Sequence, residues 1–279
     1  GREPSGEVRS PAVAGQFYSD SDAAFRLGIV KYMEGAVPAK VKKPIALILP
    51  HAGYIYSGQV AADGYNQSRM HNYEVVVILG TNHASAGFRK IGLYPGRGFR
   101  TPLGVAEIDQ EGNAELQRED RDCVADKGVH AAEHSIEVQV PFVQVLFPQA
   151  KIVPVLIGTP ELDMCTRLGL ALGKVLKNRR ALIVASTDLS HFYSQRVAEG
   201  LDQAVLDRVT AFDPLGVLQV EEEGKGFACG RGALAAVMWA AKELGADKVT
   251  ILNHATSGDV TGDYRRVVGY GAAVMLKSR

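Results

Sequence analysis

Short apolar runs rich in β-branched residues recur along the chain, and this pattern constrains the fold more than any other feature. The runs lie at Ile45–Leu49, Val75–Leu79, Ile152–Ile157, Leu182–Ala185 and Val249–Leu252. Each is short and bounded by proline, glycine or polar residues, which predicts strands rather than helices. Runs that are apolar throughout are typical of parallel strands covered on both faces.

Segments with apolar residues at helical spacing separate these strands. They are Gly58–Ser68, Glu133–Leu146, Leu162–Leu176, Val197–Ala211 and Gly232–Leu244. This alternation predicts an α/β fold with a mainly parallel central sheet and helices on both faces. A last strand is expected within Tyr264–Leu276. No linker or repeat divides residues 1–279, so we expect a single domain, with residues 1–9 as a flexible N-terminal arm.

Charge and cysteine content exclude several classes of protein. The chain has 31 basic and 31 acidic residues, and this balance argues against a nucleic-acid partner. The longest apolar runs have about five residues, whereas a membrane helix needs about 20. The three cysteines, Cys123, Cys165 and Cys229, are far apart and odd in number, which does not fit a secreted disulfide framework. We therefore expect a cytoplasmic protein with no membrane partner.

Four of the seven histidines, His51, His83, His191 and His254, directly follow predicted strands. Ligands of open α/β sheets bind beyond the carboxyl ends of the strands, so these side chains are expected to converge there. Three converging imidazoles could form a metal site. The alternative is that each histidine is an isolated polar loop residue.

Cys229 stands at the start of a predicted helix, in the sequence Ala228-Cys229-Gly230-Arg231. The positive helix end and Arg231 would lower the pKa of its thiol. A thiolate there could ligate a metal or act as a nucleophile, and the alternative is a small buried core residue. Cys123 and Cys165 lack this context and are expected to be structural.

Two hydrolase motifs receive weaker support. The segment His130-Ala-Ala-Glu133-His134 fits the H-x-x-E-H pattern of inverted zinc peptidases, in which one helix face presents both imidazoles. No residue downstream clearly supplies the third ligand, so a helix start with a surface histidine is the favoured interpretation. Ser186 and Ser190 lack the G-x-S-x-G elbow of serine hydrolases.

Six segments, in order, resemble motifs of the Memo family, whose prokaryotic members are called AmmeMemoRadiSam system protein B. The segments are Pro11–Tyr18, Pro50–Gly58, Leu79–His83, Glu133–Glu137, Ser186–His191 and Cys229–Gly230. The resemblance runs from about Ser10 to Leu276. It implies a fold similar to that of class III extradiol dioxygenases, the non-haem iron enzymes that cleave catechol rings.

The resemblance also implies a site. His51, His83 and Cys229 correspond to the family's metal-ligand candidates, and His191 corresponds to a further pocket histidine with Asp188 beside it. His191 would act as a general acid or base oriented by Asp188. The family's pocket tyrosine corresponds to Tyr56, which could hydrogen-bond a substrate oxygen.

A thiolate ligand departs from the two-histidine, one-carboxylate triad of the dioxygenases. Soft sulfur shifts metal preference toward copper, zinc or thiolate-bound iron. We therefore expect a metal-dependent redox enzyme that uses iron or copper, with zinc as an option. The family resemblance implies a radical-SAM protein as its partner. The alternative is a non-catalytic binding or adaptor module that takes an anionic or phosphorylated ligand. That interpretation would place Phe17 near the pocket, but a packed N-terminal segment is the favoured interpretation of Phe17.

Overall fold

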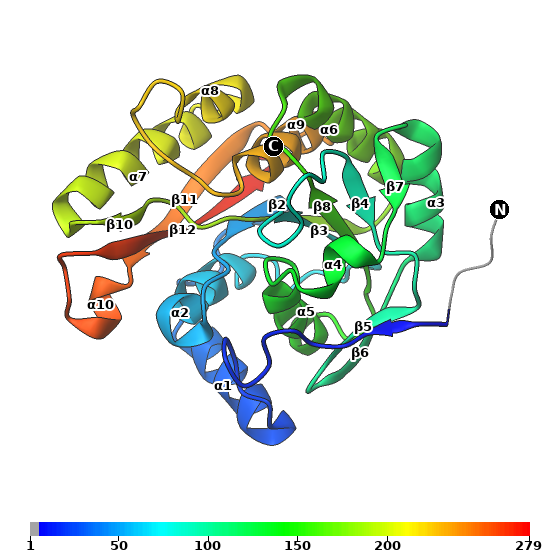
Figure 1. Ribbon diagram of the computed structural model, residues 1–279, viewed down its shortest axis with the longest axis horizontal. Helices are drawn as coiled ribbons and strands as arrows, with labels where there is room; N and C mark the ends of the chain where they lie inside the picture. Colours follow the sequence, from blue (N-terminus) through cyan, green and yellow to red (C-terminus); the bar gives the residue numbers. More distant parts are fainter. Residues whose placement is uncertain (1–5) are drawn as a thin grey trace.

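The computed structural model describes residues 6–279 and shows a nine-stranded mixed sheet between two layers of helices (Figure 1). The strands follow one another across the sheet in the order β10 (His191–Tyr193), β12 (Val267–Leu276), β2 (Pro44–Leu49), β9 (Ala181–Ser186), β3 (Val75–Thr81), β8 (Lys151–Ile157), β4 (Ile91–Leu93) and β7 (Cys123–Ala125), and β11 (Lys248–Thr256) also pairs with β12. No helix within residues 6–279 has the length and apolar character needed to cross a bilayer.

The α/β class is confirmed, but the prediction of a mainly parallel sheet is wrong. Strands β2, β9, β3 and β8 are mutually parallel. By contrast, β12 runs antiparallel to β2, β10 and β11, and β4 runs antiparallel to β8. A run that is apolar throughout reports burial on both faces, which β12 shares with the parallel strands, so the sequence pattern does not encode strand direction.

Helices cover both faces of the sheet, as predicted, and each face has its own buried apolar cluster. One layer contains α3 (Gln110–Glu119), α6 (Leu162–Leu176), α7 (Gln195–Thr210), α8 (Pro214–Gln219) and α9 (Arg231–Glu243). The other contains α1 (Asp22–Glu34), α2 (Tyr54–Tyr65) and α5 (Val140–Leu146). Shorter elements are β1 (Val8–Arg9), β5 (Gly98–Thr101), β6 (Gly104–Glu107), α4 (Gly128–Ala131), the 3₁₀ turn Glu137–Gln139 and α10 (Gly258–Thr261).

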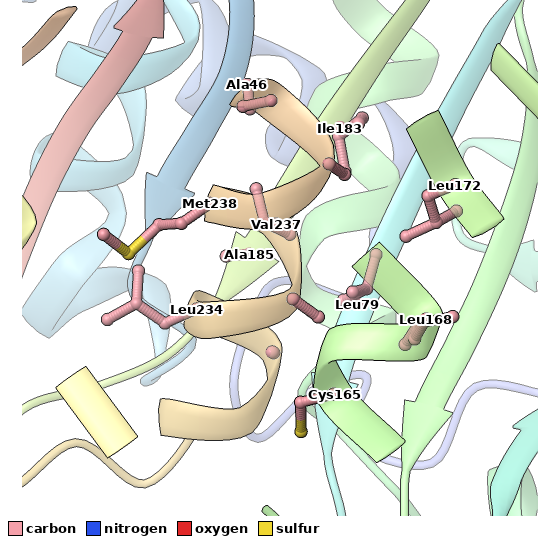
Figure 2. Close-up of a cluster of buried hydrophobic side chains, with 14 of the residues drawn as sticks. Ala46, Leu79, Cys165, Leu168, Leu172, Ile183, Ala185, Leu234, Val237 and Met238 are labelled. Carbon is pink, nitrogen blue, oxygen red and sulfur yellow. The ribbon is translucent and has the colours of Figure 1, made fainter. Parts of the chain in front are cut away.

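Helix α9 is held at a fixed place on the sheet by close packing. Its Leu234 and Val237 belong to the same buried cluster as Ile183 of β9, as Figure 2 shows. Helix α6 approaches so closely that a Cβ atom at Gly169 would lie 2.7 Å from the carbonyl oxygen of Ala236. This packing fixes the start of α9 at Arg231, two residues after Cys229.

The N-terminal segment is anchored rather than free. Val8–Arg9 forms β1, which pairs with β5, and the Arg9 guanidinium makes a buried ion pair of 2.7 Å with Glu137. The Glu137 carboxylate also accepts hydrogen bonds from the Ala12 and Val13 N–H groups and from the Tyr18 hydroxyl. The flexible arm expected over residues 1–9 is therefore wrong for residues 8–9, and residues 1–5 lie outside the described residues. We call residues 9–18 the N-terminal strap.

Candidate metal centre

Three adjacent parallel strands bring the predicted residues together at one edge of the sheet. Because β9 lies between β2 and β3, their ends place His51, Asp188 and His83 side by side. Pro50 follows β2 directly and has no N–H to continue the ladder. The ring centroids of His51 and His83 are 5.2 Å apart. The strand-end argument therefore correctly predicts the convergence of these two histidines.

Cys229 joins them from the turn that precedes α9. Its N–H donates to the Asp188 carbonyl oxygen at 3.3 Å, and the next N–H, that of Gly230, donates to Thr187 Oγ1 at 2.8 Å. A Cβ atom at Gly230 would lie 2.7 Å from the carbonyl oxygen of Ser186, so this close approach requires glycine. The turn is thereby held against the loop after β9.

The donor atoms of His51, His83 and Cys229 lie within 4.8 Å of one another. Cys229 Sγ lies 3.4 Å from His51 Nε2. A tetrahedral metal with bonds of about 2.3 Å to sulfur and about 2.1 Å to nitrogen separates two such donors by roughly 3.5 Å. The His51–Cys229 spacing therefore fits a metal ion, and the two imidazoles and the thiol are donors that transition metals bind.

A buried network fixes which nitrogen of His51 faces Cys229. Ser186 Oγ donates its one proton to the Ser135 carbonyl oxygen at 2.6 Å and accepts a hydrogen bond from Gln139 Nε2 at 3.0 Å. The same Gln139 nitrogen donates to the Pro50 carbonyl oxygen, which fixes the amide orientation. His51 Nδ1, 3.1 Å from Ser186 Oγ, must therefore be the donor. When His51 is neutral, its Nε2 carries the free lone pair that a metal needs.

Glu133 fixes which nitrogen of the His83 imidazole faces the site. Its carboxylate oxygens lie 3.2 and 3.1 Å from His83 Nδ1, which leaves Nε2 free for the site. The carboxylate also accepts hydrogen bonds from the N–H groups of His83 and Ser135. Such carboxylate–histidine pairs orient metal ligands and increase their basicity. These contacts give Glu133 a positioning role toward His83. Glu133 also forms, with His83 and His134, a second group of donor atoms within 4.8 Å of one another.

The protonation of the cluster favours a thiolate. Burial raises the pKa of the Cys229 thiol, but the charge of His51 and the hydrogen bonds from His51 and His83 outweigh burial and lower that pKa to about 6. Burial lowers the pKa of His51, but the charges of Asp188 and Cys229 outweigh it and raise the pKa to about 9. Without a metal, these pKa values favour a Cys229 thiolate beside a His51 imidazolium at neutral pH. A metal that binds His51 Nε2 would displace the proton on that nitrogen.

A third histidine, His134, completes the cluster, although the strand-end argument did not find it. Its ring lies 4.8 Å from that of His83 and 4.9 Å from that of Phe17 in the N-terminal strap. Burial and the nearby charge of His51 lower the pKa of His134 to about 4. His134 follows no strand, and in the sequence it stood out through the H-x-x-E-H spacing and the Glu133–Glu137 motif.

The zinc-peptidase interpretation of that motif is wrong. Helix α4 ends at Ala131, so His130 and His134 do not share a helix. His130 is buried, and its Nε2 donates to the Gly92 carbonyl oxygen at 2.9 Å. Burial lowers the pKa of His130 to about 4, which keeps its imidazole neutral.

The histidines open into a cavity of about 620 Å³. Its walls combine aromatic and polar side chains, namely Phe17, His51, Tyr56, His83, His134, Asp188, His191, Phe192, Ser257, Thr261, Asp263, Arg266 and Tyr270. Tyr56 comes from α2, and His191 is the first residue of β10. Every residue that the family resemblance implies at the site thus lines this cavity or, in the case of Cys229, belongs to the cluster with His51 and His83.

The contacts of Asp188 differ from the expected ones. Its Oδ1 accepts the His51 N–H at 2.9 Å, and its Oδ2 lies 3.7 Å from His51 Nε2. No hydrogen bond links Asp188 to His191 among residues 6–279. His254 also departs from expectation: β11 continues past it, and its Nε2 lies 2.7 Å from Asp202 Oδ2. His254 does not join the cluster.

A comparison with known protein families covers the residues of this site. The family model described as "Memo-like protein" matches residues 9–274. The chain belongs to the Memo-like family. The motif resemblance found in the sequence is thereby confirmed.

Curated members of the Memo-like family match along almost their whole length. A MEMO1 family protein of Methanopyrus kandleri is 39% identical over 281 residues, covering 96% of this chain and 99% of that protein. Those of Methanothermobacter thermautotrophicus and Nitrosopumilus maritimus are 38% and 36% identical, with 94% and 95% of this chain and 98% of each relative covered.

A solved structure shares the fold. The crystal structure of an uncharacterized protein from Escherichia coli K12 matches with a TM-score of 0.54 and 13% identity, covering 82% of this chain and 99% of that one. At this identity, the likeness concerns the fold alone.

Proposed function

We propose that this Memo-like protein is a metal-dependent redox enzyme whose metal is held by His51, His83 and Cys229. The observation that carries the proposal is the donor set itself: three ligand atoms lie within 4.8 Å, and the hydrogen bonds to each imidazole Nδ1 leave Nε2 facing the site. Bound iron or copper would supply one-electron chemistry, whereas zinc would supply Lewis-acid chemistry.

The cavity residues divide the remaining roles. His191 is assigned the transfer of protons to or from substrate, and Tyr56 a hydrogen bond to a substrate oxygen. Asp188 is assigned a positioning role through the His51 backbone, because its contact is with that N–H. The aromatic walls remove a substrate from bulk water, which strengthens each of these polar contacts.

Two further parts of the proposal come from the family resemblance. The first is a fold of the class III extradiol dioxygenase type, supported by histidines at the carboxyl ends of parallel strands. Thiolate ligation would separate this protein from ring-cleaving members of that type. The second is a radical-SAM protein as partner, which co-purification from a cell containing both proteins would test.

Metal analysis of untagged protein purified without oxygen tests the metal site. We expect close to one equivalent of iron or copper in the wild type and a large loss in the double variant His51→Ala/Cys229→Ser. The matched control, His71→Ala/Cys123→Ser, removes one histidine and one cysteine outside the cluster and should keep the metal. Equal metal content in the two double variants would contradict the assignment.

Turnover separates an enzyme from a binding module. We expect consumption of dioxygen or of a reductant that depends on His83 and disappears when a chelator removes the metal. Saturable ligand binding without such turnover would favour the alternative, a non-catalytic binding or adaptor module using the same cavity for an anionic or phosphorylated ligand.

A further inference from the structure

The edge strand β10 is distorted where it borders the cavity. His191 pairs with Val268 and Tyr193 pairs with Val267, so the register shifts at Phe192. Phe192 has φ = 68°, in the left-handed region that non-glycine residues rarely adopt. Bulges of this kind redirect side chains and are frequent beside active sites. Here the bulge leaves the Phe192 side chain exposed on the cavity wall.

Arg266 lies over that exposed ring. Its guanidinium carbon is 5.4 Å from the centre of the Phe192 ring, and both side chains line the cavity that contains His51 and His83. The nearby Asp263 carboxylate is already engaged by Arg265, whose Nε lies 3.1 Å away. Among residues 6–279, the Arg266 guanidinium makes no hydrogen bond or ion pair. The cavity wall therefore carries a guanidinium whose N–H donors are unused by the described residues, stacked on an aromatic face. The hydrogen bond from Arg265 and the charge of Arg266 both lower the pKa of the Asp263 carboxyl, which keeps it ionised beside the two arginines.

We propose that Arg266 and Phe192 form an entrance site for a planar aromatic carboxylic acid, which is the substrate class of the cavity. Arg266 binds the carboxylate through its planar fork of N–H donors, and Phe192 stacks on the ring. We place the other end of the acid at the metal, and this part of the proposal rests on the proposed function. The entrance site itself does not depend on a metal.

The rest of the wall suits such a ligand. Phe17, Tyr56 and Tyr270 also line the cavity and add aromatic faces to its wall. A volume of about 620 Å³ is within the usual range for pockets that hold a small organic molecule. The carboxylate of Asp188 accepts the His51 N–H, so its negative charge is partly compensated within the protein.

Calorimetric titration with a matched pair of probes tests the entrance site. The probes are 2-naphthoate and the neutral 2-naphthamide, which share a ring system and differ in charge. The protein is the full chain, measured both metal-loaded and after treatment with a chelator. Variants are Arg266→Gln, the equal charge change Arg196→Gln outside the cavity, and Phe192→Asn, which removes the ring but tolerates a positive φ.

We expect the wild type to bind naphthoate more tightly than naphthamide. Arg266→Gln should weaken naphthoate binding about tenfold and change naphthamide binding less than about twofold, because only the charged hydrogen bonds are lost. Phe192→Asn should weaken both probes by about three- to tenfold through lost stacking. Arg196→Gln should leave both unchanged.

Two results would overturn the entrance site: a wild type that does not prefer naphthoate, or equal naphthoate affinities in Arg266→Gln and Arg196→Gln. An Arg266 effect that persists in chelator-treated protein supports the entrance site even if metal analysis refutes the metal centre. A metal centre confirmed by His51→Ala/Cys229→Ser, together with no Arg266 effect, refutes the entrance site alone.

Discussion

Replacing Ser186 by alanine should weaken metal binding without touching a ligand. The hydroxyl is the acceptor that holds the His51 Nδ1 proton, 3.1 Å away, and without it the imidazole is free to rotate or to change tautomer. Loss of such an outer partner typically lowers metal affinity by about 10- to 100-fold. This corresponds to about 1.4 to 2.8 kcal/mol of binding free energy.

The same substitution also affects folding. Gln139 Nε2 keeps its bond to Pro50, but the buried carbonyl oxygen of Ser135 loses the Ser186 hydroxyl as donor. His51 Nδ1 also loses its acceptor, so two buried groups are left without a partner. Each such group costs about 1–3 kcal/mol, so urea unfolding of the metal-free variant should show a loss of at least this size. Metal affinity should be compared by competition with a chromophoric chelator at a temperature where both proteins are folded.

Ser190→Ala is the matched control. Ser190 Oγ is buried and has no hydrogen-bond partner among the described residues, so its removal leaves no group unsatisfied. We expect wild-type metal affinity and stability in this variant. Equal metal affinities of Ser186→Ala and Ser190→Ala would refute the idea that Ser186 sets the tautomer of His51.

Three further predictions concern stability, measured by urea unfolding of metal-free protein. Glu137→Gln should cost about 3–5 kcal/mol because it leaves Arg9 as a buried charge without its counterion, whereas Glu7→Gln, in an exposed pair, should cost less than about 1 kcal/mol. His130 is kept neutral by burial, with a pKa of about 4. The part of the free energy of unfolding that depends on neutral His130 is complete above pH 6.5. It decreases by about 3 kcal/mol as the pH falls toward 4. Gly200→Ala, in α7 with open space around its Cα, should stabilise by up to about 1 kcal/mol.

Each of these has a result that would contradict it. Equal losses for Glu137→Gln and Glu7→Gln would show that burial of the Arg9 pair does not matter. If His130→Gln loses as much stability as the wild type between pH 7 and pH 4, protonation of His130 is not the cause. Destabilisation by Gly200→Ala would mean that α7 has a neighbour at this position.

Helices and strands were predicted well from the sequence where the spacing of apolar residues matches the pattern of burial. Helix Leu162–Leu176 has the predicted bounds, and the strand predicted at Val75–Leu79 lies within β3. Helix α1 was missed, although Phe25, Ile29 and Met33 recur every four residues on its buried face. Its exposed Leu27 and Val30 blur that pattern.

The site was predictable as far as strand ends determine it. His51 and His83 follow parallel strands that are neighbours of β9, so their convergence follows from topology. The prediction that His254 lies at a strand end is wrong, because β11 continues to Thr256, beyond the apolar run that marked its core. His134 and Glu133 come from a loop whose position depends on the Arg9–Glu137 anchor, and no local pattern encodes a contact across 128 residues.

The anchored N-terminal strap has a consequence for how the protein is made. The cavity wall includes Phe17, near the start of the chain, and Tyr270, near its end. A nascent chain emerges from its N-terminus, so the strap leaves the ribosome long before Glu137 and well before β12. The wall of the cavity is therefore completed only when β12 has been made and has paired with β2 and β10.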